Sequence, residues 1–183
     1  MRDSDQELIE EIRAGSEGAF EELMNRYERL VYRISFIYTG DREDSLDITQ
    51  NVFIKVYRKL ESYRGTGAFK AWLMRITHNE NIDWSRSHAR YRKHDELTVE
   101  NAPQLEARQE SEASQSENRG RLMRELLGLN PRQREAVMLR YFERMSIREI
   151  SSILDCTEGT AKSLVFRALE RLRGRMVPQG SEL

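Results

Sequence analysis

The chain has 183 residues, of which 38% are hydrophobic and 33% are charged, and its formal net charge is −1 at pH 7. This length fits one ordinary domain or two small ones, and the composition favours small helical units over one large core. Glycine and proline number only 10 and 3, and no segment alternates apolar and polar residues as strands do, so we expect an all-α fold. The single cysteine, Cys156, excludes an internal disulfide and fits a reducing compartment.

Charge is distributed unevenly along the chain. The net charge is −7 over residues 1–50, +7 over 51–94, −6 over 95–118 and +6 over 119–177. The two basic blocks predict two nucleic-acid surfaces, although charge blocks of this size also occur as solvated faces. The acidic start of the chain lacks the apolar core of a signal peptide, and no stretch reaches 18 apolar residues, so we expect a cytoplasmic protein.

Four helices are expected in the first half of the chain. Ser4 begins a capping box ahead of a short helix that ends near Gly15, and Ser16 caps a second helix that ends at Gly40. The third helix starts after Asp41, and the fourth follows the SYRGTG segment at 62–67. Apolar spacing places the following side chains of the third helix inward: Leu46, Val52, Phe53, Val56, Tyr57 and Leu60. In the fourth helix the inward positions beyond Ile76 become polar (Asn79, Glu80 and Asp83), which indicates a polar partner or a helix end outside the core.

The second half begins with a polar segment and continues with four helices. Residues 94–118 have no apolar period and are rich in Glu, Ser and Gln, so we expect a flexible acidic linker, with a polar helix over about 104–117 as the alternative. A helix stopped by Gly128 precedes the Asn130-Pro131 start of the next one, whose inner face holds Val137, Met138 and Tyr141. Ser146 and Thr157 are expected to cap the last two helices.

These last two helices have the outline of a helix-turn-helix over residues 146–173. Phe166 falls on the polar face of the second helix, opposite its apolar stripe, together with Lys162, Ser163 and Arg167. The basic side chains of Lys162 and Arg167 can reach phosphates or guanine edges, and Ser163 can hydrogen-bond DNA. The Phe166 ring can contact a thymine methyl group or the sugar–phosphate wall. Gly159 allows close approach to phosphate. The alternative is that Phe166 packs on the helix at 132–142.

Three stretches resemble the extracytoplasmic-function sigma factors of bacterial RNA polymerase over nearly the whole chain. GDREDSLDITQNVFIKVYRKLESYRG (40–65) and AFKAWLMRITHNENID (68–83) are similar to region two of the family. LNPRQREAVMLRYFERMSIREISSILDCTEGTAKSLVFRALERLR (129–173) is similar to region four. The resemblance implies a region two domain at 1–93, the linker at 94–118, a region four domain at 119–177 and a tail at 178–183.

The resemblance also implies three sets of contact residues. Region two would bind core polymerase through Asp44, Asp47, Ile48, Gln50, Asn51 and Ile54. All of these except Gln50 are also predicted from helical spacing to face away from the apolar stripe of the third helix. It would hold a melted base of the minus-ten element with Tyr63 and Asn79, and the backbone of that strand with Arg64, Lys70 and Arg75. Region four would read the minus-thirty-five duplex through Arg148, Gly159, Thr160, Lys162, Ser163, Phe166 and Arg167.

The implied function is promoter-specific transcription initiation without catalysis, cofactor or metal. Core RNA polymerase and promoter DNA are the expected partners, with an anti-sigma protein, membrane-linked in some cases, and no small-molecule substrate. The three histidines, His78, His88 and His94, show no metal-binding spacing, which weighs against an enzyme. A stand-alone helix-turn-helix regulator has no need of the 41–93 block, and a helical scaffold has no use for the basic blocks.

Overall fold

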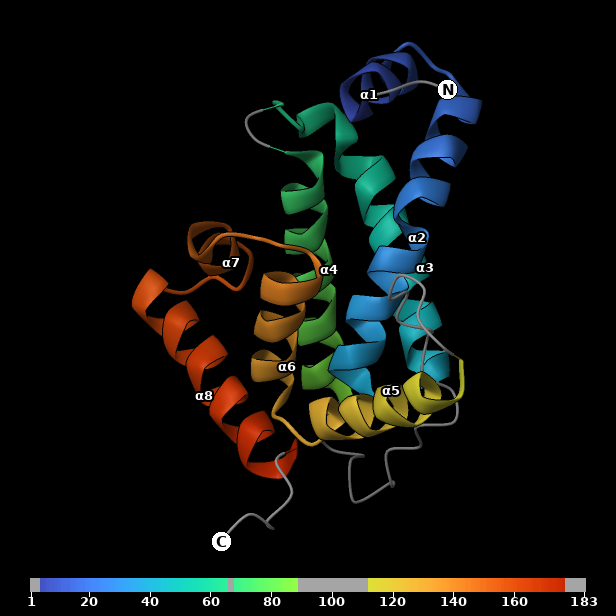
Figure 1. Cartoon of the computed structure of the whole chain (residues 1–183). Helices are drawn as coiled ribbons and strands as arrows, with labels where there is room; N and C mark the ends of the chain where they lie inside the picture. The colour runs from blue at the N-terminus through green and yellow to red at the C-terminus, as the bar shows by residue number, and fades with distance from the viewer. Residues whose placement is uncertain (1–3, 66–67, 89–111, 177–183) are drawn as a thin grey trace, which may run out of the picture. The chain divides into compact units, whose positions relative to one another are not determined.

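The computed structural model describes residues 4–65, 68–88 and 112–176, and over these residues the chain is helical with no β-strand (Figure 1). The all-α prediction is therefore confirmed. The helices form two units. One contains the described residues up to 35 and from 43 to 88, and the other contains residues 36–42 with those from 112 to 176.

The first unit contains four α-helices and one short turn. They are α1 (Asp5–Arg13), α2 (Glu17–Thr39, whose last residues belong to the other unit), α3 (Arg42–Lys59, whose first residue also belongs to the other unit), the 3-10 turn η1 (Leu60–Ser62) and α4 (Phe69–His88). The predicted caps form: the Ser4 side chain accepts the Glu7 N–H at 3.2 Å, and Ser16 Oγ accepts the Ala19 N–H at 3.4 Å. Gly15, at φ +93°, ends the first helix as expected, because only glycine adopts that angle without strain.

Two groups of buried and half-buried side chains hold this unit together. Aliphatic residues, each contributing about 1.5–3 kcal/mol when fully buried, form the core. A cluster of four aromatic rings lies where α2, α4 and the turn after η1 meet, and its members are Tyr27, Tyr63, Phe69 and Trp72. The buried aliphatic residues include Leu8, Ile9, Leu23, Val31, Val52, Val56, Leu60 and Leu73.

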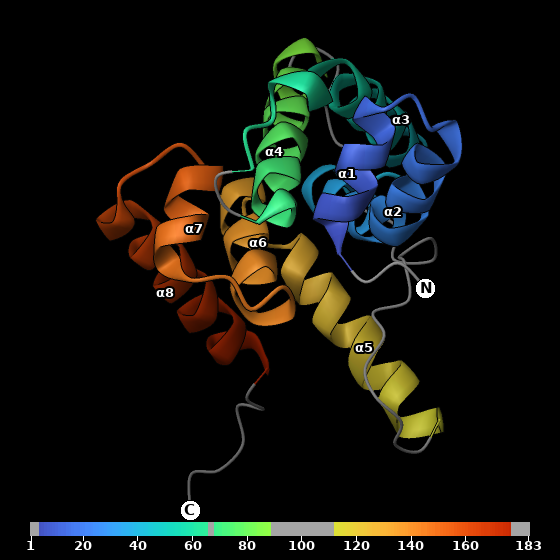
Figure 2. The ribbon, with the colours of Figure 1, turned by 90° about the horizontal axis from the view of Figure 1, so that it is seen from above.

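The second unit contains α5 (Glu112–Leu127), α6 (Pro131–Val137), the π-helical turn η3 (Met138–Phe142), α7 (Ile147–Ile153) and α8 (Glu158–Met176). Helix α8 packs against α5, α6 and α7, and Figure 2 shows it beside α6 and α7. The predicted helix starts are confirmed. Asn130 accepts the Gln133 N–H at 2.9 Å, Ser146 and Glu149 form a full capping box, and Thr157 Oγ1 accepts the Thr160 N–H at 3.1 Å.

Two expectations about helix extent need adjustment. Helix α5 begins at Glu112, inside the segment expected to be a linker, while residues 94–111 lie outside the described residues. The helix that starts at Pro131 ends in a π-helical turn, in which the Glu143 N–H donates to the Met138 carbonyl at 3.1 Å. Tyr141, which we predicted to point inward, is 54% exposed in this turn.

Candidate nucleic-acid and protein interfaces

Helices α7 and α8 form the predicted helix-turn-helix. The chain reverses between them at Asp155, which has φ +48°, in the left-handed region that Asp tolerates better than most residues. The guanidinium of Arg132, on α6, donates to the carbonyl of Leu154 at 2.7 Å and so ties the turn to the neighbouring helix. The turn is thereby fixed by a contact to an element outside the motif.

Helix α8 has one buried and one exposed face. Ala161, Val165, Ala168 and Leu172 are buried, whereas Lys162, Ser163 and Arg167 are exposed. Phe166 is 59% exposed on this polar face. Most of its ring therefore faces solvent, which is not what packing against the helix at 132–142 would produce.

The start of α8 is open on its outer side. Gly159 and Thr160 are exposed there, and Arg148 is exposed on the preceding helix, α7. A Cβ added at Gly159 would meet nothing closer than Thr157 Oγ1, at 3.8 Å. The fold of the chain therefore does not require glycine at this position, and any requirement would come from a ligand that approaches the backbone.

A second set of predicted residues lies on α4 and the turn before it. Arg64, Arg75 and Asn79 are exposed and Lys70 is half-buried. Arg75 and Asn79 are one helical turn apart, so they lie on the same face of α4. We predicted an inward position for Asn79, and that placement is wrong.

Tyr63, predicted to stack on a base, is only 6% exposed. Its ring centroid lies 5.7 Å from that of Phe69 and 5.1 Å from that of Trp72. Burial raises the pKa of Tyr63 above its ordinary value; the charge of Asp5 adds to this effect and that of Arg13 opposes it. In this conformation the ring supports the turn from inside, so direct stacking on a base stays a prediction.

The polar end of α4 has a polar partner within the same unit. Glu80 is 8% exposed and pairs with the ammonium group of Lys55 on α3. Lys55 Nζ also lies 3.8 Å from the Asp83 carboxylate. A buried carboxylate is tolerated when a charged donor compensates it, which accounts for the change from apolar to polar positions along this helix.

The inner face of α3 differs from the one predicted. Val52, Phe53 and Val56 are buried as predicted, but the buried stripe continues through Ser45, Ile48 and Thr49 and leaves out Leu46 and Tyr57. Ile48, predicted to contact a partner, is 2% exposed, so that placement is wrong and the side chain offers no surface for docking. The remaining residues of that set keep accessible surface: Asp47, Gln50, Asn51 and Ile54 are exposed, and Asp44 is half-buried.

This choice of inner face leaves other apolar side chains of α3 exposed. Leu46, Ile54 and Tyr57 are 43%, 48% and 59% exposed, and of these only Ile54 was predicted to be outside. Between α2 and α3 lies an open cleft of about 560 Å³. At this cleft the Tyr57 ring packs edge-on against Phe20, with centroids 5.0 Å apart. The cleft is mainly apolar and is lined by Phe20, Met24, Glu28, Thr49, Gln50, Phe53, Ile54, Tyr57 and Arg58.

Within the described ranges, no group of three or more His, Cys, Asp or Glu side chains is placed to hold a metal ion. None of the helices there combines the length and apolar character needed to cross a membrane.

Comparison with known proteins identifies the family. Residues 23–91 match the model for sigma-70 region 2, and residues 119–172 match the model for sigma-70 region 4. The ECF RNA polymerase sigma-E factor of Haemophilus influenzae is 31% identical over 96% of this chain and 96% of its own length. The chain is an extracytoplasmic-function sigma factor. The sigma-E factor of Escherichia coli K12, 32% identical over 96% of this chain and 95% of its own length, agrees.

Solved structures show the same fold for this sigma factor. CnrH, in complex with the cytosolic domain of CnrY, matches with a TM-score of 0.67 and 21% identity, over 94% of this chain and 96% of its own. RpoE of Bartonella quintana, in complex with the anti-sigma factor NepR, matches with a TM-score of 0.68 and 22% identity, over 88% of this chain and 98% of its own. The sigma factor directs transcription initiation, and the stand-alone regulator is not favoured.

Proposed function

We propose that this sigma factor recognises its promoter with two separate surfaces and binds core RNA polymerase with a third. The observation that carries the proposal is the exposed face of α8, where Lys162, Ser163, Phe166 and Arg167 lie opposite a fully apolar stripe. A solvent-facing aromatic ring among basic side chains in the first half of the second helix of a helix-turn-helix suits the major groove. This surface, with Arg148, Gly159 and Thr160 beside it, reads the minus-thirty-five duplex.

The second surface comprises the turn after α3 and the outer face of α4. Arg64 and Arg75 are exposed basic residues that hold the phosphates of a melted strand, with Lys70 beside them. Asn79 presents an exposed amide, which hydrogen-bonds a base edge. The buried ring of Tyr63 supports the turn from inside the unit. It stacks on the base only if the ring moves out of the aromatic cluster into solvent. This surface holds the non-template strand of the minus-ten element.

The third surface is the cleft between α2 and α3 with the exposed residues beside it. Ile54, Tyr57 and Leu46 provide apolar area that the unit does not bury, and Asp47, Gln50 and Asn51 provide polar groups around it. An apolar centre with a polar rim is typical of a protein interface. We assign this surface to core RNA polymerase.

An anti-sigma protein is proposed as a further partner. CnrH was solved with CnrY and RpoE with the anti-sigma factor NepR, and both share the fold of this chain. An inhibitor of this kind is expected to compete with core polymerase, so excess core should restore transcription. As an initiation factor without catalysis of its own, the protein would act in the cytoplasm, where polymerase and DNA meet.

Run-off transcription with core polymerase tests the assignment of the two DNA surfaces. Lys162→Ala/Arg167→Ala is expected to lose binding to the upstream duplex. Asn79→Ala is expected to keep that binding and to lose opening, measured as permanganate reactivity of unpaired thymines. Arg121→Ala, which removes an exposed charge on α5, is the control and should retain both. Equal, negligible effects of the two test variants would refute the assignment.

A further inference from the structure

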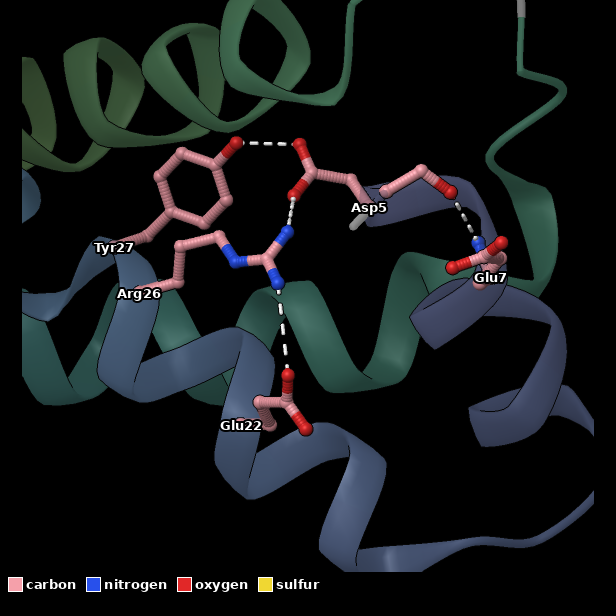
Figure 3. Close-up of polar contacts among 6 residues, drawn as sticks. Asp5, Glu7, Glu22, Arg26 and Tyr27 are labelled. Carbon is pink, nitrogen blue, oxygen red and sulfur yellow. Dashed lines mark hydrogen bonds and ion pairs between the residues drawn. The ribbon is translucent and has the colours of Figure 1, made fainter. Parts of the chain in front are cut away.

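Helix α1 is tied to α2 at its N-terminal end. The hydroxyl of Tyr27 donates to Asp5 Oδ2, and Arg26 Nη1 donates to Asp5 Oδ1 at 2.7 Å (Figure 3). Arg26 also lies 3.6 Å from the Glu22 carboxylate. Two donors therefore converge on one carboxylate in the first turn of α1, where the helix dipole also favours a negative charge.

At its other end α1 is tied to the turn that follows α3. The guanidinium of Arg13 donates to the backbone carbonyl of Tyr63, and it reaches the carbonyl of Leu60 at 3.4 Å. Leu60 begins η1 and Tyr63 follows it directly. The Leu60 carbonyl also accepts the Tyr63 N–H at 3.1 Å, and a planar guanidinium can donate to two carbonyls at once. The contact joins residues 50 positions apart in the chain.

Tyr63 is consequently held from two directions. Arg13 holds its carbonyl, and its ring packs in the aromatic cluster against Phe69 and Trp72. Tyr27, whose hydroxyl is bonded to Asp5, has its own ring 5.4 Å from that of Phe69. Both ends of α1 are therefore linked to the position of Tyr63, one directly and one through the cluster.

The N-terminal end of α1 also lies close to the turn that follows α3. Gly65 has φ +70°, and a Cβ added there would lie 3.6 Å from Gln6 Oε1 on α1. Arg64 lies between the fixed residue 63 and this left-handed residue, and it is exposed. The direction in which the Arg64 side chain points away from the backbone therefore depends on contacts that α1 makes with the neighbouring residues.

We propose that α1 is a brace for the 60–65 turn, and that Arg13 is a positioning residue that sets how this turn meets the melted minus-ten strand. The inference rests on the proposed role of the turn and of α4 in holding that strand. Arg13 acts on the backbone of the turn, not on DNA. Fixing a loop before binding lowers the entropy cost of association and sharpens discrimination between similar ligands.

The test measures base preference, which a general loss of positive charge does not change. Holoenzyme is titrated with a labelled single strand that carries the minus-ten sequence of a promoter transcribed by the wild type. A second strand has one base of that element changed. The ratio of the two affinities is the readout. We expect Arg13→Ala to reduce this ratio roughly tenfold, toward one, because that factor is within the range that one well-placed base contact contributes to discrimination.

Two controls separate positioning from charge and from folding. Arg42→Ala removes an exposed charge from the first residue of α3 and should leave the ratio unchanged. Trp72 fluorescence, recorded in a Trp84→Phe background because these are the two tryptophans, reports on the cluster beside Tyr63. Arg13→Ala should shift its emission to longer wavelength well below the unfolding temperature, because the turn loosens while the fold remains.

The outcomes distinguish this inference from the function on which it rests. A wild type without base preference would refute the minus-ten role itself. A wild type with preference, together with an unchanged ratio in Arg13→Ala, would overturn the brace alone. If Arg13→Ala does not fold, Arg13→Lys serves instead. Lysine keeps the charge but lacks the planar fork, so an intermediate ratio is expected and a wild-type ratio overturns the proposal.

Discussion

Replacing Phe166 with alanine should weaken promoter binding while leaving the fold intact. The ring is 59% exposed, so less than half of its surface contributes to folding. Alanine also has the higher helix propensity, which offsets part of the small packing loss. We therefore expect the free energy of unfolding to change by less than about 0.5 kcal/mol, as is usual for surface substitutions.

The effect on binding is larger because the exposed part of the ring is what DNA would cover. A phenylalanine side chain offers about 150–250 Å² in total, so the exposed part is roughly 100 Å². At about 25 cal/mol per Å², full coverage is worth roughly 2.5 kcal/mol. A groove contact that covers part of this area contributes about 1–2 kcal/mol to binding. Removing the ring should therefore lower the affinity roughly 5- to 30-fold.

The assay is a titration of holoenzyme with minus-thirty-five duplex and with unrelated duplex at several salt concentrations. Phe166→Ala should lose affinity for the specific duplex with an unchanged salt slope, because no phosphate contact is lost. Lys162→Ala should reduce the slope by about 1 and weaken both duplexes alike. Leu172→Ala, on the buried face of the same helix, should lower stability by about 2–5 kcal/mol without changing the preference of the folded fraction.

An unchanged ratio of specific to unrelated affinity in Phe166→Ala would refute the reasoning. So would a change in its salt slope equal to that of Lys162→Ala. Either result would mean that the ring is exposed for a reason other than reading the groove.

Three further predictions concern the first unit. Ile54→Asp should weaken binding to core polymerase at least tenfold in a competition assay, because a charge at the cleft must be desolvated on docking, and stability should be nearly unchanged since Ile54 is 48% exposed. Lys55→Met should lower the free energy of unfolding by about 1–3 kcal/mol in urea denaturation, because the buried Glu80 carboxylate loses its charged donor, and an unaltered midpoint would contradict that pairing. Burial, together with the hydrogen bond to Asp5, raises the pKa of Tyr27, so its stabilisation is complete below the ordinary pKa of 10.0 and is lost at higher pH. Tyr27→Phe should therefore be less stable than wild type near neutral pH, and its free energy of unfolding should fall less than that of wild type as the pH rises above 10.0. Parallel pH profiles of the two proteins would contradict this assignment.

The exposed face of α8 was predictable because its apolar residues form a single stripe. With Ala161, Val165, Ala168 and Leu172 committed to the core, the opposite side is determined by helix geometry alone. The helix starts at Ser4, Asn130 and Ser146 were predictable for a related reason, since a cap and the N–H it accepts lie within three residues of each other.

Helix α3 could not be oriented in the same way. Its apolar residues occur on several sides, so the period of the sequence fits more than one inner face. The prediction placed Ile48 outside and Leu46 and Tyr57 inside, and the structure reverses all three. The packing of the unit selects the face, and this selection places apolar side chains beside the cleft.

Local chemistry along the chain therefore determined the helical class, the caps, the helix-turn-helix and the polar face of α8, because each depends on residues a few positions apart. Tertiary structure alone decided which face of α3 is buried, how Glu80 is paired and how Arg13 holds Tyr63. These contacts join residues 25 and 50 positions apart. The physical reason is that a helix carries its own hydrogen bonds, whereas the partner of an inward side chain is known only once the helices have packed.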